Sequence, residues 1–308
     1  MRTFAPATAG QKRAPREPRR RYSRLLTTLA LLPALVLATA VSGCSASGEA
    51  KTRLIVTGST TILPIAEISS ESFQKANAGV KVLVSGVGSS AGIESVSSGS
   101  ADIGTSSRDL KPEEKSLGLV DTPIAYDAIA VIVNPSNPVR ALTKAQVKAI
   151  FQGHITNWRE VGGRDMPIGL VNRDEASGTR EAFSKIVLDK EPFDAAAAVL
   201  PGTGQVRAVV ESSPSAIGYI SLGFVTPQVK ALTVDGVRPS VATVVDGSYP
   251  VRRLLHFFTK GAPEPLAKRY IDYVLSAPVQ SSIVRDAGFI PITARTESGE
   301  QRGGKDAK

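Results

Sequence analysis

Short apolar runs alternate with amphipathic segments between residues 53 and 292. The run at 80–85 alternates apolar and polar positions, as a strand does, whereas the segment at 63–76 repeats its apolar positions with the period of a helix. The run at 124–134 is almost wholly apolar, as expected for a strand buried on both faces. The pattern predicts strands at 53–57, 80–85, 101–104, 124–134, 168–171, 217–220 and 252–258, and helices at 63–76, 91–98, 143–151 and 178–188. This alternation predicts an α/β fold with largely parallel sheets.

The N-terminal segment has the layout of an export signal. A basic stretch that ends at Arg24 precedes an uncharged apolar stretch at 25–41, and Val41-Ser42-Gly43 then leads to Cys44. The apolar stretch is short for a membrane span and contains Pro33. Small residues directly before a cysteine resemble a bacterial lipobox, in which the signal is cut and the thiol is acylated. The sequence therefore predicts a lipoprotein signal peptide at 1–43 and a lipidated Cys44 with a tether that reaches residue 52.

Other interpretations of this segment remain open. They are a plain secretory signal, a retained anchor and, because of the run Arg19-Arg20-Arg21, export by the twin-arginine route instead of the general one. The tail at 293–308 is polar and glycine-rich, which is typical of disorder.

Charge and cysteine content exclude several classes of protein. The first 43 residues carry +7 of the net charge of +9, so the remainder offers no strongly basic surface for nucleic acid. One cysteine allows no internal disulfide, and with His154 and His256 as the only histidines no Cys/His metal cluster can form. No cofactor motif is present, and the phosphate loop of nucleotide hydrolases is absent.

Three predicted strand-to-helix turns share one chemistry. They read GSTT at 58–61, GVGSSAG at 86–92 and NRDEASGT at 172–179. Helix N-termini present unpaired N–H groups, glycine allows close approach, and hydroxyls add uncharged donors. Arg173 could hold two oxygens of a tetrahedral anion with its guanidinium. Because such turns open at one edge of a parallel sheet, the three predict a small-anion site, although each turn alone is also explained as helix capping.

A serine hydrolase is the main alternative among enzymes. Gly88-Ser89-Ser90-Ala91-Gly92 fits the G-x-S-x-G pattern between a strand and a helix, with Ser90 as the nucleophile. That reaction needs a histidine, and His256 is the better placed of the two. His256 lies within an apolar strand, however, which favours a structural role, so we expect no catalytic residue.

Several motifs together resemble the substrate-binding lipoproteins of ABC-type phosphate importers, within the periplasmic-binding-protein superfamily. The resemblance covers residues 55–292. It rests on GSTTILPIAE at 58–67, GVGSSAGIESV at 86–96, SADIGTSSRDL at 100–110, IAVIVNPSNPV at 129–139, IFQGHITNWREVGG at 150–163, NRDEASGTREAF at 172–183 and AIGYISLG at 216–223.

The resemblance implies a set of phosphate contacts. Arg173 would hold two phosphate oxygens, with Glu175 orienting its guanidinium. Many members of this family have an aspartate at the position of Ser107, where it accepts the proton that hydrogen phosphate carries and sulfate lacks; Arg108 would add a second charge. The implied contacts are Thr60, Thr61, Ser89, Ser107, Arg108, Arg173, Ser177, Gly178 and Thr179.

The resemblance also implies a two-lobed type II binding-protein fold, each lobe a mostly parallel sheet flanked by helices. Lobe 1 would comprise 53–127 and 253–292, and lobe 2 would comprise 128–252. Two hinge segments, at 124–134 and near 249–255, would join the lobes, which close around the ligand.

The implied partners are inorganic phosphate, the membrane subunits of an ABC permease, and the outer face of the cytoplasmic membrane through the acylated Cys44. A monomer without cofactor, metal or nucleic acid is expected. The alternatives are a binding protein for sulfate or molybdate, the hydrolase that uses Ser90, and a sensor or adhesion module with the same fold.

Overall fold

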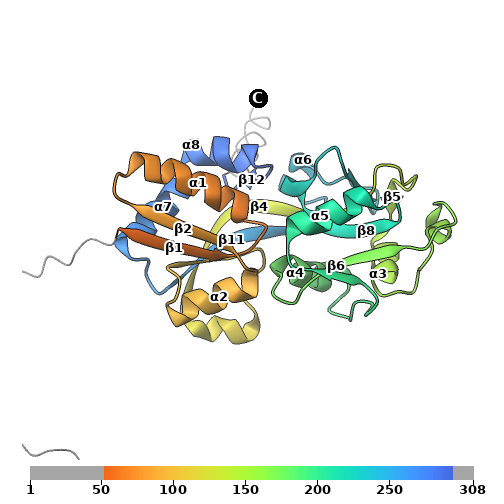
Figure 1. The fold of residues 1–308 in the computed structure, drawn as a ribbon, viewed down its shortest axis with the longest axis horizontal. Helices are drawn as coiled ribbons and strands as arrows, with labels where there is room; N and C mark the ends of the chain where they lie inside the picture. Colours follow the sequence, from red (N-terminus) through yellow and green to blue (C-terminus); the bar gives the residue numbers. More distant parts are fainter. Residues whose placement is uncertain (1–51, 294–308) are drawn as a thin grey trace, which may run out of the picture. The chain divides into compact units, whose positions relative to one another are not determined.

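The computed structural model describes residues 52–293 (Figure 1). The strands are β1 (Arg53–Gly58), β2 (Lys81–Gly86), β3 (Ile103–Ser106), β4 (Leu119–Val133), β5 (Ala141–Leu142), β6 (Gly169–Arg173), β7 (Ala198–Leu200), β8 (Ala216–Ser221), β9 (Lys230–Ala231), β10 (Thr233–Val234), β11 (Arg252–Lys260) and β12 (Ile290–Pro291). The α-helices are α1 (Leu63–Ala76), α2 (Ser89–Ser98), α3 (Lys144–Phe151), α4 (Gly178–Val187), α5 (Thr203–Ser212), α6 (Val241–Val245), α7 (Pro265–Leu275) and α8 (Ala277–Val279). Shorter helical turns are η1 (Pro112–Leu117), η2 (Trp158–Val161), η3 (Leu222–Phe224) and η4 (Gln280–Val284).

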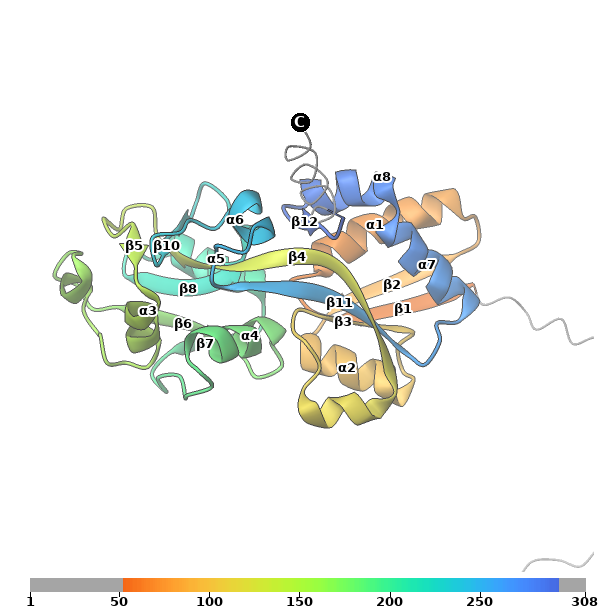
Figure 2. The same ribbon diagram turned by 180° about the vertical axis from the view of Figure 1, so that it is seen from behind.

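The principal sheet runs in the order β2-β1-β3-β11-β4-β8-β6-β7. Strands β1, β2 and β3 are mutually parallel, and so are β6, β7 and β8. Helices cover both faces of each group (Figures 1 and 2). We call lobe 1 the part built on β1–β3, β11 and the first half of β4, and lobe 2 the part built on β6–β8 and the second half of β4.

Two long strands join the lobes. Strand β4 pairs with β11 through residues 119–128 and with β8 through residues 129–133. Ile124 packs in the core of lobe 1, and Val131 packs in the core of lobe 2. Strand β11 enters lobe 1 after Val251, which packs in the core of lobe 2. Figure 2 shows β4 and β11 side by side between the lobes, so the two crossings expected from the sequence are present.

The sheet is mixed as a whole, but within each lobe it is mostly parallel, as expected from the sequence. Strand β11 runs antiparallel to both β3 and β4, and β4 runs antiparallel to β8. The reason is topological: a chain that crosses to lobe 2 on one strand must return on a strand of the opposite direction. The turns that matter for the site follow the parallel strands, and their common edge is preserved.

Each lobe has its own hydrophobic core. In lobe 1, Phe73 of α1 and Tyr270 of α7 pack edge to face at 5.4 Å between ring centroids on one face of the sheet. In lobe 2, Phe183 of α4 stacks on Tyr219 of β8 with centroids 4.1 Å apart. Two separate cores allow the lobes to move as units about the two strands between them.

Some sequence-based predictions lie outside the described residues. These are the signal peptide at 1–43, the lipidation of Cys44, most of the tether that follows it, and the tail from residue 294 onwards. Within residues 52–293, no helix is long and apolar enough to cross a membrane.

Candidate functional site

Lobe 1 contributes two strand-to-helix turns and the end of β3. Gly58 adopts φ of +139°, and a Cβ there would lie 2.2 Å from the carbonyl oxygen of Thr105. Its own carbonyl accepts the N–H groups of Val87 and Gly88, both at 2.8 Å, which fastens the second turn to the first. These tight contacts require glycine and bring the hydroxyls of the two turns to one edge of the sheet.

Lobe 2 contributes the starts of α4 and α5. Ser177 caps α4 by accepting the N–H of Arg180 at 3.2 Å. Helix α5 begins at Thr203, after Gly202, and its N-terminus faces the same cleft. Sequence reasoning identified the start of α4 and missed that of α5, although Pro201-Gly202-Thr203-Gly204 carries the same combination of glycine and hydroxyl.

The hydroxyls of the two lobes meet directly. Thr60 lies 3.1 Å from Thr203, and Thr61 lies 3.0 Å from Thr179, oxygen to oxygen. Ser107 Oγ lies 3.5 Å from Thr179 Oγ1. A Cβ on Gly178 would stand 2.3 Å from Ser89 Oγ, so the first residue of α4 lies against the second turn of lobe 1. We call the group Thr60, Thr61, Ser89, Ser107, Thr179 and Thr203 the hydroxyl cluster; Thr60 is half-buried and the other five are buried.

Arg173 reaches the hydroxyl cluster from the end of β6. Its Nη1 donates to Thr203 Oγ1 at 3.1 Å and its Nη2 to Thr60 Oγ1 at 3.3 Å. The remaining donors bind the carbonyl oxygens of Leu200 and Pro201. The residue is 2% exposed, and burial lowers the pKa of its guanidinium, opposed in part by Asp174. Among the described residues no carboxylate forms an ion pair with Arg173, so its buried charge has only neutral hydrogen-bond partners.

A second guanidinium, which sequence reasoning did not identify, reaches the same hydroxyls. Arg253 of β11 donates to Thr179 Oγ1 at 2.9 Å and approaches Thr61 Oγ1 at 3.5 Å. Its Nε and Nη2 both donate to Asp127 Oδ2, at 2.9 and 2.8 Å, and Asp127 is directly opposite it in the β4–β11 register. Asp127 also accepts the hydroxyl of Ser221 at 2.7 Å. Arg253 is therefore a neutralised cation at the base of the cleft.

Two residues of the predicted set, Arg108 and Glu175, form no described side-chain contact with the hydroxyl cluster. Arg108 binds both oxygens of Glu114 at 2.6 and 2.7 Å, and its Nε lies 3.5 Å from Glu181 of α4. The carboxylate of Glu175 is exposed, and its ion pair, at 3.9 Å, is with Arg180. The expectation that Glu175 orients Arg173 is therefore corrected: its side chain turns to solvent, and backbone carbonyls orient Arg173 instead.

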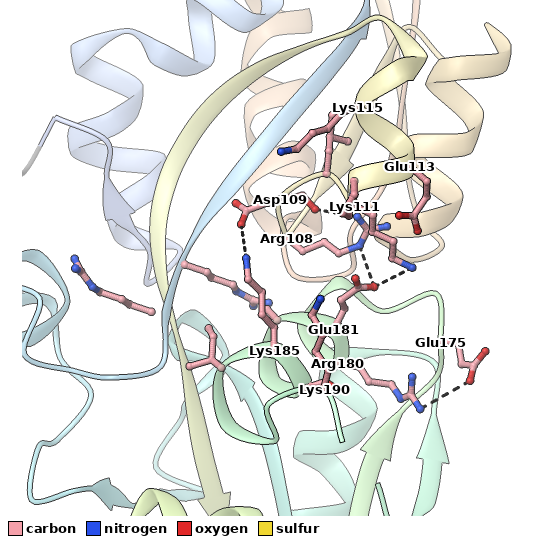
Figure 3. A pocket seen from close by; sticks show the side chains of 17 residues that line it. Arg108, Asp109, Lys111, Glu113, Lys115, Glu175, Arg180, Glu181, Lys185 and Lys190 are labelled. Atoms are coloured by element: carbon pink, nitrogen blue, oxygen red, sulfur yellow. Dashed lines mark hydrogen bonds and ion pairs between the residues drawn. The ribbon is translucent and has the colours of Figure 1, made fainter. Parts of the chain in front are cut away.

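The loop after β3 and helix α4 form ion pairs across the cleft. Lys111 lies 3.1 Å from Glu181, and Lys185, one turn further along α4, lies 3.2 Å from Asp109 (Figure 3). We call Arg108, Asp109 and Lys111 with Glu181 and Lys185 the interlobe clasp. His256 and Lys185 hold the pKa of Asp109 at about 2 although partial burial acts in the other direction, so this carboxylate stays charged.

The residues of the hydrolase alternative are engaged elsewhere. Ser90 Oγ accepts a hydrogen bond from Arg108 at 3.2 Å. His256 contacts Asp121 at 2.8 Å through Nδ1 and stacks on Phe258. Burial alone would lower the pKa of His256, but its contacts with Asp109 and Asp121 raise it. No described contact joins Ser90 to a histidine, and within residues 52–293 no group of three potential metal ligands gathers.

Comparisons with known proteins agree with this architecture. Residues 45–278 match the model of the PBP superfamily domain, the domain of periplasmic-binding proteins. The chain is 39% identical to the phosphate-binding protein PstS of Bacillus subtilis over 257 residues, which cover 81% of this chain and 84% of that protein. It is 32% identical to PstS of Borreliella burgdorferi, over 76% and 88% of the two chains.

Solved structures give the same result. A Clostridium perfringens protein, assigned as a phosphate ABC transporter substrate-binding protein and solved with bound phosphate, has a TM-score of 0.76 and 39% identity; the match covers 78% of this chain and 99% of that one. An ABC-type phosphate transport receptor from Vibrio cholerae has a TM-score of 0.66 and 30% identity, with coverage of 77% and 99%. The fold is that of a two-lobed periplasmic-binding protein. Within this superfamily the chain belongs to the PstS family of phosphate-binding proteins.

Proposed function

We propose that this protein captures inorganic phosphate between its lobes outside the cytoplasmic membrane and delivers it to an ABC importer. The observation that carries the proposal is the buried charge of Arg173, which has only neutral partners and faces hydroxyls from both lobes. A buried, unneutralised cation among convergent donors favours a small anion. Phosphate is the ligand in the names of the similar proteins.

The ligand contacts that we propose are the hydroxyl cluster, both guanidinium groups, and the start of α4 at Ser177 and Gly178. Arg173 would donate to two phosphate oxygens. Arg253, held in place by Asp127, would contribute from the hinge strand. Contacts from both lobes stabilise the closed form more than the open form, and this difference in affinity drives closure. No covalent step is involved.

The remaining features of the proposal concern location and movement. The signal peptide would direct export, and acylated Cys44 would tether a monomer to the outer face of the membrane, beside the permease. Lobe 1 (53–127 and 253–292) and lobe 2 (128–252) would open and close about β4 and β11. The relatives are transport receptors by name, which favours a binding role over the hydrolase.

Calorimetric titration of the soluble part, residues 45–308, with phosphate and then sulfate tests the ligand. We expect phosphate to bind with a Kd of micromolar or below, equivalent to about −8 kcal/mol or better. Tighter binding of sulfate than of phosphate would overturn the choice of ligand, and binding of neither would overturn the function.

Replacing Ser107 by aspartate tests selectivity. A hydroxyl at this position can accept a hydrogen bond from the P–OH group of hydrogen phosphate but does not repel sulfate, so we expect the natural protein to retain measurable sulfate binding. In Ser107→Asp a buried carboxylate should raise the phosphate-to-sulfate affinity ratio by about a hundredfold. Ser107→Asn is the matched control, because its uncharged amide should leave the ratio near that of the natural protein. Competition titrations of both variants measure it, and an unchanged ratio in Ser107→Asp contradicts the expectation.

The interlobe clasp should slow phosphate release. Glu181→Gln removes the charge that attracts Arg108 and Lys111 but keeps the size of the side chain. Because partly exposed ion pairs contribute about 0.5–1 kcal/mol in total, we expect the dissociation rate to rise about two- to fivefold. Stopped-flow measurement of release checks this, with Glu94→Gln on the exposed side of α2 as control. Equal release rates in the two variants would show that the clasp contributes nothing.

A further inference from the structure

A groove of about 940 Å³ opens beside the hydroxyl cluster, between the loop after β3 and helix α4 (Figure 3). Eight basic and four acidic side chains line it. In Figure 3 the basic side chains come from both walls, with Arg108, Lys111 and Lys115 on the side of lobe 1 and Arg180, Lys185 and Lys190 on the side of lobe 2.

Much of this charge is already neutralised. Glu114 and Asp127, which stand behind the lining, pair with Arg108 and Arg253, and the clasp pairs Lys111 and Lys185 with acids of the lining. When Glu114 and Asp127 are counted together with the lining residues, the net charge around the groove is +2.

Three basic residues and one acidic residue, Glu113, form no described ion pair, and together they give this excess of two. Lys115 on η1, Lys190 after α4 and Arg252 on β11 are exposed, and no described carboxylate forms an ion pair with any of them. Arg252 Nη1 donates to the carbonyl oxygen of Val244 at 3.5 Å. These cations come from three separate elements, so they distribute positive potential along the groove and do not form one tight anion site.

The groove ends at a residue that also touches the hydroxyl cluster. Arg253 lines the groove, and its guanidinium donates to Thr179 and approaches Thr61. Its neighbour in the chain, Arg252, is exposed and also lines the groove. The cations of the groove therefore include exposed residues and one residue that touches the proposed phosphate contacts.

We propose that this groove is the access route of the ligand, and that Lys115, Lys190 and Arg252 accelerate the association of doubly charged oxyanions. The inference rests on the proposed function, since it takes the hydroxyl cluster as the destination. A cleft with a net excess of one sign of charge focuses the field between its low-dielectric walls and raises the local concentration of counter-ions. The effect acts on encounter, so it belongs to the association rate and not to the stability of the closed complex.

Stopped-flow association of phosphate with the soluble part, residues 45–308, tests this route. At low ionic strength we expect the triple variant Lys115→Gln, Lys190→Gln, Arg252→Gln to associate about five- to tenfold more slowly, with a dissociation rate within twofold of the natural one. The difference should vanish near 1 M salt, where the Debye length is about 3 Å. Lys81→Gln, an exposed lysine at the far end of β2, is the matched control and should leave both rates unchanged.

Each outcome is decisive. An unchanged association rate in the triple variant, or natural-protein association that does not slow with added salt, overturns the access route while the proposed function stands. A change confined to the dissociation rate also overturns it, because the cations would then act on the bound state. Failure of the natural protein to bind phosphate at equilibrium is a separate result, and it overturns the proposed function. The salt dependence of the natural protein needs no variant, so a poorly folded variant leaves the test intact.

Discussion

Arg173→Ala should weaken phosphate binding by about a hundredfold. Two charge-assisted hydrogen bonds to phosphate oxygens, at about 1.5 kcal/mol each, account for a loss of this size. The natural guanidinium also satisfies the carbonyl oxygens of Leu200 and Pro201, so the variant should unfold at a somewhat lower temperature as well. Calorimetric titration measures the affinity, and thermal unfolding without ligand measures the structural part.

Arg173→Lys separates charge from geometry. Lysine keeps the positive charge but lacks the planar fork that can hold two oxygens and the backbone carbonyls at once. We expect binding to fall between that of the natural protein and that of Arg173→Ala. If Arg173→Ala bound phosphate within threefold of the natural protein, the buried cation would not be a ligand contact and the proposed site would be wrong.

Arg253→Met should cost both stability and binding. Removing the guanidinium leaves Asp127 as a buried carboxylate with Ser221 as its hydrogen-bond donor, and loss of one partner of a buried ion pair typically costs about 3–5 kcal/mol. The hydroxyls of Thr179 and Thr61 lose their charged donor at the same time. Denaturant unfolding of the ligand-free protein should show the loss of stability directly.

The double variant Arg253→Met, Asp127→Asn distinguishes the two roles. Neutralising Asp127 removes the uncompensated charge, while the amide oxygen still accepts the hydroxyl of Ser221, so most of the stability should return. Phosphate affinity should remain at least tenfold below that of the natural protein, because the cation is still missing. Recovery of both properties in the double variant would show that Arg253 is only a structural residue.

Local chemistry made the principal turns predictable. Glycine beside hydroxyl residues marks the turns that precede α1 and α4, and parallel strands bring such turns to one edge whatever the rest of the fold. The strands of the hinge were also predictable, because the apolar run from Ile124 is that of a strand buried on both faces.

Arg253 could not be recognised in this way, because its role depends on register. It contacts the hydroxyl cluster since β11 returns between β3 and β4 and places it opposite Asp127. No local pattern encodes a pairing between residues so far apart in the chain. The signal is a charged residue in each strand, Asp127 in one and Arg253 in the other, and it becomes informative once the two strands are known to be neighbours.

Arg108 stays a predicted phosphate contact, implied by the family resemblance. In the structure its guanidinium binds both oxygens of Glu114, six residues later. The resemblance did not predict this ion pair, because it depends on the direction of the side chain. Glu175 and Arg173 lie two residues apart in one turn, but their side chains point in different directions. Glu175 is exposed to solvent, whereas Arg173 reaches the hydroxyl cluster.

The path of the chain through the two lobes has a consequence for biosynthesis. All the strands and helices of lobe 2 lie between β4 and β11, so this lobe is complete in sequence before β11 has emerged. Lobe 1 is not, because β11 occupies the place between β3 and β4 in its sheet. We therefore expect lobe 2 to fold first as the chain emerges from its N-terminus. The sheet of lobe 1 can be completed only after the C-terminal strand β11 has emerged.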